Sequence, residues 1–289
     1  AARVSLDLRE PAAVQSAPRK LMKAAAAPKS GVLRQGRLAA GATKVAPLNV
    51  GDTLGLQLFE GAEVELTLKE QTDGSMGGRS FLAEANGYAG VKNAVVVETA
   101  DGLQVDIQDY KTGKVYTVYS GASGVVVKEL APVRGQTVPT AETPPPEMLL
   151  SAEGLGPKEM LSSDPPGDTR LDILVAFDAN ACSYAELQGG GMTNFAQVAV
   201  QKMNAALANT GLSELFRFRL VGVMAVDATE RDVHEALYAI SAGEDGWAAI
   251  AEKREEVGAD IVTTLIDTGS ASGTVGVGWS LSDGMEPAI

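Results

Sequence analysis

The sequence predicts an α+β protein in which a β-rich domain is followed by a three-layer α/β domain with a mixed, mostly parallel sheet. Residues 51–130 contain short runs that alternate apolar and polar residues, which is the pattern of half-buried strands. Residues 131–170 contain eight of the 13 prolines and are expected to be a linker. Residues 171–289 alternate strand-like and helix-like segments, which indicates parallel strands joined by helices.

Residues 1–50 are expected to be a basic leader, with nine Lys and Arg against two acidic residues, ahead of an acidic body. The leader has no aromatic side chain for base stacking, so we expect no nucleic-acid partner and favour a leader that lies on the body. No run of 18 apolar residues is present, which predicts that the chain has no transmembrane segment. Because the first residue is Ala, we expect a secreted, cell-envelope or periplasmic protein after removal of a signal peptide.

The β-rich domain is expected to contain about six strands. Residues 63–69 alternate strictly, with Val64, Leu66 and Leu68 on one face. Further runs rich in β-branched residues are 94–97, 103–107, 114–119 and 124–128.

The α/β domain is expected to begin with a strand over residues 171–177, which is apolar enough to be buried on both faces. Thr193 is expected to cap a helix that ends at Gly211. The apolar face predicted for this helix is Phe195, Ala199, Met203, Ala206 and Leu207. The expected later elements are a strand at 216–226, helices at 232–240 and 245–257, a strand at 259–266 and an edge strand at 274–279.

Asp267 begins an Asp-Thr-Gly sequence like that of the aspartic proteases. Their chemistry needs two carboxylates that share a proton, and the sequence has no second Asp-Thr-Gly or Asp-Ser-Gly. Asp-Thr-Gly is also a favourable turn after a strand. We therefore favour a strand end and keep an aspartic protease using Asp267 as a weaker alternative.

The run from Asp178 resembles the metal-binding strand end of von Willebrand-type adhesion domains only weakly, because Asn180 and Cys182 replace the two hydroxyl residues. Cys182 is the only cysteine and His234 the only histidine. The residues of this sequence alone therefore form neither an intrachain disulfide nor a site with several histidines. Cys182 is expected to be a buried apolar residue or half of a disulfide with another part of the protein.

Five segments carry a resemblance to a known family: 171–178, 204–212, 218–227, 255–266 and 273–279. In this order and spacing, residues 171–281 resemble the N-terminal subdomain of metzincin zinc endopeptidases, particularly reprolysin-like and related bacterial secreted forms. Residues 51–130 resemble the propeptide that precedes such domains, notably at 51–59 and 111–118.

The resemblance implies a zymogen: a β-rich propeptide domain, a linker and the N-terminal part of a catalytic domain. The zinc-binding His-Glu-x-x-His-x-x-Gly-x-x-His motif is absent, so the zinc ligands and catalytic residues are expected beyond residue 289. The implied partners are the C-terminal remainder of the catalytic domain, as a continuation or second chain, and a protein or glycoprotein substrate. This fragment alone is expected to be inactive.

The edge strand is the expected substrate-binding element, through pairing of its backbone with an extended peptide. Its residues are Thr274, Val275, Gly276, Val277, Gly278 and Trp279. An ordinary edge strand is the alternative. In the latent form Asp164 or Glu153 could ligate zinc, although solvated linker carboxylates are the favoured interpretation. The alternative function for the whole chain is a non-catalytic secreted adhesion or binding module.

Overall fold

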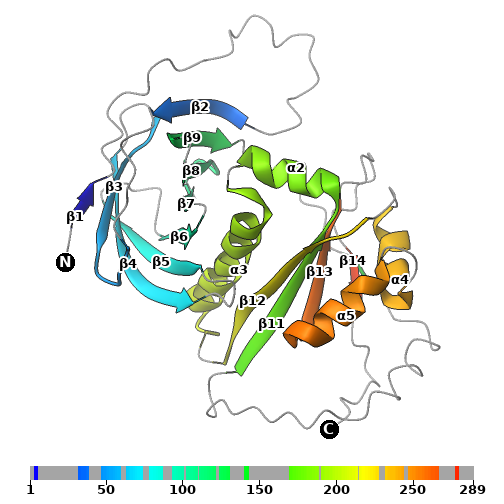
Figure 1. The fold of residues 1–289 in the computed structure, drawn as a ribbon. Helices are drawn as coiled ribbons and strands as arrows, with labels where there is room; N and C mark the ends of the chain where they lie inside the picture. The colour runs from blue at the N-terminus through cyan, green and yellow to red at the C-terminus, as the bar shows by residue number, and fades with distance from the viewer. Residues whose placement is uncertain are drawn as a thin grey trace, which may run out of the picture.

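The computed structural model contains two separate β-sheet units joined through one long helix (Figure 1). The residues it describes are 3–5, 32–38, 47–59, 63–73, 78–86, 93–100, 102–109, 111–121, 124–130, 140–142, 169–188, 190–213, 215–227, 232–243, 247–266 and 277–279. Among these residues, no helix combines the length and the apolar character needed to cross a membrane.

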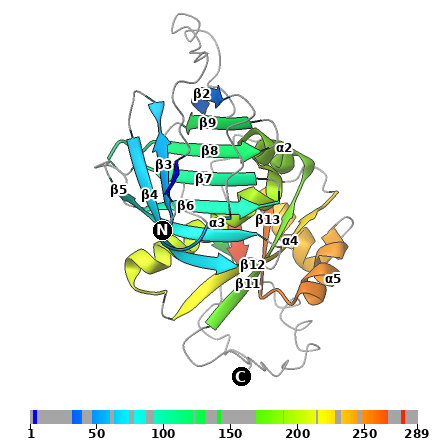
Figure 2. The same cartoon turned by 60° about the vertical axis from the view of Figure 1, so that its left-hand side comes forward.

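The first unit, called here the large sheet, is a curled nine-stranded sheet with the order β1-β3-β4-β5-β6-β7-β8-β9-β2 (Figures 1 and 2). Every neighbouring pair is antiparallel except β1 and β3. The strands are β1 Arg3–Ser5, β2 Val32–Leu38, β3 Thr53–Gln57, β4 Glu63–Asp73, β5 Arg79–Asn86, β6 Asn93–Thr99, β7 Gly102–Gln108, β8 Val115–Gly121 and β9 Gly124–Leu130.

One face of the large sheet forms its own core. Val64, Leu66 and Leu68 point into it, as their alternation predicts, and Phe81 from β5 is fully buried beside them. Two strands, β1 and β2, come from residues 1–50, where the sequence showed no periodic pattern, and they pair with β3 and β9. The sequence therefore revealed the hairpins of the large sheet but not its two outer strands.

The second unit, called here the small sheet, has three parallel strands in the order β12-β11-β13. They are β11 Thr169–Phe177, β12 Phe216–Ala225 and β13 Ile261–Leu265. The helices are α2 Ala179–Gln188, α3 Gly191–Thr210, α4 Val233–Ala242 and α5 Ala248–Val257. A separate two-stranded ribbon pairs β10 Thr140–Glu142 with β14 Val277–Trp279.

The small sheet is the middle of three layers (Figure 1). On one face Ile173 and Leu220 pack against Ala196 and Val200 of α3. On the other face Leu174 packs in a cluster that includes residues of α4 and α5. Apolar side chains thus cover both faces, as buried parallel strands require.

The prediction of a mixed, mostly parallel sheet is wrong. Nearly all pairings in the large sheet are antiparallel, and the three strands of the small sheet are all parallel. The strand expected at the edge of the α/β sheet, β14, instead pairs with β10 from the linker region. A three-residue strand takes whichever backbone edge lies beside it, and sequence patterns do not identify a partner that lies so far away in the chain.

The start and the buried face of α3 also differ from the expectation. The helix begins after Gly190, whose φ of 85° is left-handed, so Thr193 lies inside the helix instead of capping it. Its end at Gly211, with a φ of 75°, is confirmed. Ala199, Met203 and Ala206, predicted to be buried, are exposed. The buried side chains are Met192, Asn194, Ala196, Gln197, Val198, Val200 and Gln201.

Candidate functional site

The predicted substrate-binding strand lies in the ribbon of β10 and β14. Thr140 pairs with Val277, Ala141 with Gly278 and Glu142 with Trp279, in parallel register. Of the predicted set, Thr274, Val275 and Gly276 lie outside the described residues. The structure therefore brings Val277, Gly278 and Trp279 to a backbone edge that holds an extended segment of the same chain.

Gly278 occupies an open position in this ribbon. A Cβ atom added to it would meet no heavy atom within 4 Å. A Cβ projects from the face of a strand, so this open space lies over the ribbon and not at its hydrogen-bonding edge. β10 shows that this edge accepts such a segment, although here the segment is internal.

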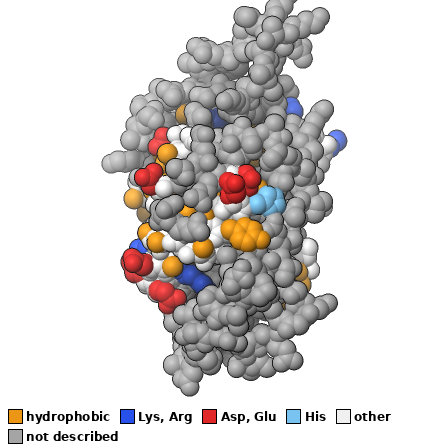
Figure 3. Space-filling model, turned by 90° about the vertical axis from the view of Figure 1, so that its right-hand side faces the viewer, with side chains coloured by type: hydrophobic (Ala, Val, Ile, Leu, Met, Phe, Trp, Pro, Cys, Tyr) orange, Lys and Arg blue, Asp and Glu red, His pale blue; other side chains and the backbone are white. Residues whose placement is uncertain are grey.

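Helix α4 contacts β14 and carries the only histidine on its first turn. The carboxylate of Asp232 caps this helix by accepting hydrogen bonds from the backbone N–H of His234, at 2.8 Å, and of Glu235, at 3.0 Å. These bonds, with that from Glu235 the stronger influence, hold the pKa of Asp232 below its usual range. Figure 3 shows the histidine beside acidic side chains on this exposed side of the molecule. Asp232 thus stabilises the helix start.

The described residues do not fit a zinc ion. They contain no group of three or more His, Cys, Asp or Glu side chains placed to hold a metal. Cys182 forms no disulfide and lies in α2, which packs on α3, whereas His234 lies in α4 on the opposite face of the small sheet. The predicted positions Asp164, Glu153 and Asp267 lie outside the described residues. No zinc-dependent step can be assigned to the side chains seen here.

Asp178 at the end of β11 has a structural role. Its carboxylate accepts a 2.6 Å hydrogen bond from the N–H of Ala181, so it caps α2. Its own N–H donates to the carbonyl of Leu265 in β13. Asn180 and Cys182 lie inside α2 and so do not form a metal-binding loop like that of adhesion domains. Helix α2 was not predicted, because residues 179–188 have little helical periodicity.

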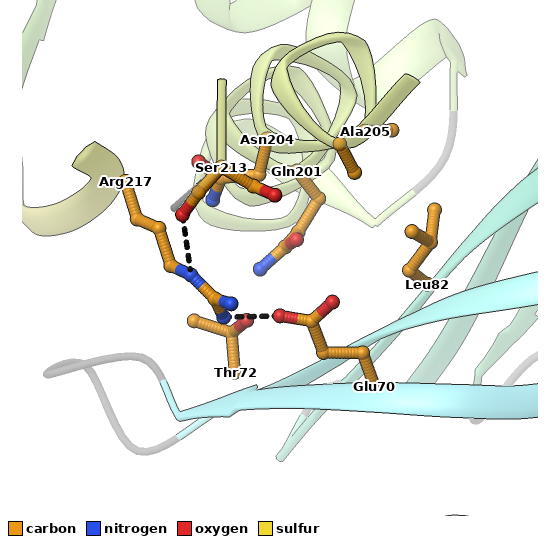
Figure 4. A pocket seen from close by; sticks show the side chains of 9 residues that line it. Glu70, Thr72, Leu82, Gln201, Asn204, Ala205, Ser213 and Arg217 are labelled. Atoms are coloured by element: carbon orange, nitrogen blue, oxygen red, sulfur yellow. Dashed lines mark hydrogen bonds and ion pairs between the residues drawn. The ribbon is translucent and has the colours of Figure 1, made fainter. Parts of the chain in front are cut away.

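A second polar site, also missed, lies where the two units meet (Figure 4). A cleft there is lined by Glu70 and Thr72 of β4, Leu82 of β5 and residues of α3 and the following loop. Arg217 of β12 forms an ion pair with Glu70, and its Nε donates to the Ser213 carbonyl. Arg217 and Glu70 neutralise each other in this cleft. We therefore interpret the cleft as part of the surface where the two units contact each other.

Comparisons with known proteins give no match, either to a family model or to a curated protein.

Proposed function

We propose that the chain is part of a secreted zinc endopeptidase zymogen that hydrolyses peptide bonds of proteins or glycoproteins. In this proposal the large sheet is the propeptide domain, and residues 171–289 are the N-terminal part of the catalytic domain. The zinc ligands belong to sequence beyond residue 289. The observation that carries the proposal is the pairing of β14 with an extended segment, because a peptidase must hold its substrate extended.

Two features of the fold support this division. The large sheet has a core of its own, so it can act as a unit that is added to the catalytic part and later removed. The small sheet has helices on both faces and is followed along the chain by β14. This order agrees with the resemblance to the metzincin N-terminal subdomain.

In the proposed enzyme, β14 binds the substrate through its backbone N–H and carbonyl groups, and the space around Gly278 is open. The segment Thr140–Glu142 occupies the same edge and competes with substrate. The enzyme is then latent because a substrate must displace a strand that is covalently attached and therefore present at high effective concentration. Chemistry at the scissile bond comes from residues outside this chain.

The experiment is to express the chain together with the reading frame that follows Ile289, process it, and measure bound zinc and peptidase activity. Gly278→Pro removes a backbone N–H and should lower kcat/KM by about tenfold or more. Gly278→Ala is the matched control and should keep kcat/KM within about twofold, since its Cβ meets no neighbour. Asp267→Asn should leave activity intact.

Three results would contradict the proposal. If the protein that includes the sequence after Ile289 folds but binds no zinc and cleaves no peptide, the adhesion or binding module is favoured. Loss of all activity in a folded Asp267→Asn protein would revive the aspartic protease. Equal kcat/KM for the Gly278→Pro, Gly278→Ala and parent enzymes would remove β14 from the substrate site.

A further inference from the structure

Helix α3 has two buried sides of opposite character, one against each sheet (Figure 1). Toward the small sheet it presents Ala196 and Val200, which pack in an apolar cluster. Toward the large sheet it presents Asn194, Gln197 and Gln201, whose side chains are almost completely buried. A helix that is apolar toward one neighbour and polar toward the other belongs structurally to the first.

Ser80 of β5 is central to the polar contact. Its hydroxyl is fully buried and accepts hydrogen bonds from Gln197 Nε2 at 2.7 Å and Gln201 Nε2 at 2.9 Å. It donates to the carbonyl of Thr72 at 3.3 Å. Near the start of α3, the Thr99 hydroxyl donates to Asn194 Oδ1 at 2.8 Å. Each of these bonds replaces one that water could make, so the net gain from each is small.

Two ion pairs flank these hydrogen bonds. Lys202 Nζ of α3 lies 3.0 Å from Asp106 Oδ1 of β7, and Arg217 of β12 pairs with Glu70 of β4. The side chains of Lys202, Arg217 and Glu70 are 45%, 40% and 41% exposed, respectively. The Arg217–Glu70 pair is exposed at both ends, so it is weak and is screened by salt. In the other pair the Asp106 side chain is only 8% exposed, and salt acts on it through the exposed Lys202 ammonium.

Packing between the units is incomplete. Three buried side-chain atoms among the described residues have no hydrogen-bond partner in the protein, and they belong to Gln104, Asp106 and Asn194. The Lys202–Asp106 pair is accordingly a charge contact without hydrogen-bond alignment. Gln104 pairs in register with Val97, which packs on Val198 of α3. Asp106 Oδ1 has the Lys202 ammonium beside it, whereas the unpartnered atoms of Gln104 and Asn194 lie on the faces where the large sheet and α3 meet, and each weakens the contact.

The apolar part of the contact is small. Among the described residues its buried apolar cluster consists of Val95 and Val97 of β6 and Val198 of α3. The large sheet alone buries a far larger cluster on its other face. Contacts between separable units are more polar than the core of either unit, and this contact has that character.

We infer that the contact between α3 and the outer face of β5–β7 is a releasable, salt-sensitive interface, and that the large sheet is a folded partner that α3 binds reversibly once the intervening chain is cut. Separation exposes amides, hydroxyls and charges, which water solvates, and leaves both apolar cores closed. The inference concerns this interface alone and holds whatever reaction the second unit performs.

The test uses the full chain with a site for a sequence-specific protease inserted after Gly135, cut while the protein is folded, so that β10 and its partner β14 stay on the same piece. At low salt and high concentration the two pieces should elute together in size-exclusion chromatography. On dilution, or in about 1 M NaCl, they should separate as two folded pieces, because the Debye length falls to about 3 Å. Circular dichroism reports whether each piece stays folded, and tryptophan fluorescence reports on the second piece, which contains Trp247 and Trp279.

Variants identify the interface. Ser80→Ala leaves two buried amides without an acceptor and should weaken association about tenfold. Ser120→Ala is the matched control, since Ser120 is a buried serine on the opposite face of the same sheet, and it should leave association unchanged. Because Glu70 is exposed, the Glu70→Gln variant should still fold, and the salt dependence of its dissociation constant should be smaller than that of the parent.

Pieces that stay together in 1 M salt at nanomolar concentration, or that separate only when they unfold, would overturn the inference. So would equal weakening by Ser80→Ala and Ser120→Ala, or an unchanged salt dependence in Glu70→Gln. If Ser80→Ala fails to fold, the salt dependence of the parent protein and of Glu70→Gln still decides the matter.

Discussion

The large sheet and the small sheet bury their strands in different ways. In the large sheet, β3 to β9 follow one another along the chain and each pairs with its sequence neighbour, so local hairpins build one core. In the small sheet the three strands are parallel, and β11 lies between two strands that follow it later in the chain. Hairpins can close with short loops, whereas parallel strands need crossover helices to cover their faces. The small sheet therefore depends on helices that the large sheet does not need.

This difference also decides what each unit loses when its neighbour is removed. The large sheet keeps its inner core when α3 leaves, because that core contains residues of its own strands alone. The small sheet would lose the cover of one face if α3 left it, since Ile173 and Leu220 pack on that helix. α3 is thus an integral part of the small-sheet unit, and the two units should unfold separately.

Core truncations provide the largest expected effect. Phe81 in the large sheet and Leu174 in the small sheet are both fully buried. Phe81→Ala should destabilise the large-sheet unit by about 3–5 kcal/mol, and Leu174→Ala the small-sheet unit by about 2–5 kcal/mol. Each should leave the other unit within about 0.5 kcal/mol, because distant sites are nearly additive. Calorimetry measures both transitions.

Fluorescence separates the two transitions, because both tryptophans, Trp247 and Trp279, lie outside the large sheet. Val50→Ala is the control, since Val50 is exposed and its truncation should change neither transition. A single cooperative transition that Phe81→Ala and Leu174→Ala shift alike would show that the units fold as one.

A buried lysine in the large sheet provides an intermediate effect. Lys128 of β9 is buried opposite Thr117, and among the described residues no ion pair includes it. Burial lowers the pKa of its amine. The unfolded chain therefore binds more protons between the folded pKa and about 10.4, and the free energy of unfolding rises with pH through that window.

Lys128→Met should consequently raise the unfolding midpoint of the large sheet near pH 7 and remove its further rise toward about pH 10. Lys69→Met, at an exposed lysine of the same sheet, is the matched control and should produce no such gain. Denaturant titrations at several pH values measure the midpoints. If Lys128→Met is less stable than the parent at neutral pH, its ammonium is stabilised by the fold and the pKa argument fails.

Local patterns predicted the parts of the fold that depend on neighbouring residues. Val64, Leu66 and Leu68 alternate, and they do share one face. Gly211 was predicted to end a helix, and the helix predicted at 245–257 does end at Val257, just before Gly258; both glycines adopt the left-handed conformation that glycine permits. These features follow from side-chain spacing and backbone freedom, which a sequence shows directly.

Contacts between distant segments were not predictable in the same way. Asn194, Gln197 and Gln201 have the polarity of solvent-facing residues, yet they are buried because a second sheet lies against α3. The register of β14 against β10 is set by three-dimensional proximity, so no sequence period indicates it. The proposed substrate edge was therefore only partly predictable: its strand could be located, but not the segment that occupies it.

The smallest expected effect concerns one helix of the small-sheet unit. Asp232 is an exposed cap of α4, and its pKa is lowered chiefly by the hydrogen bond from the Glu235 N–H and then by that from His234. A lowered folded pKa means that the stabilisation is fully present above the unfolded value of about 3.9 and is lost as the pH falls through the folded value.

Asp232→Ala should therefore lower the melting temperature of the small-sheet unit slightly at neutral pH, and the difference from the parent should shrink in acid. Asp232→Asn is the matched control, because asparagine caps helices as well but does not titrate in this range. It should retain most of the stability at neutral pH and lack the acid-dependent loss. The large sheet contains no part of α4, so its own transition should not move in either variant. A shift of both transitions by Asp232→Ala would mean that the start of α4 supports the contact between the units, and that the two sheets are less independent than their separate cores imply.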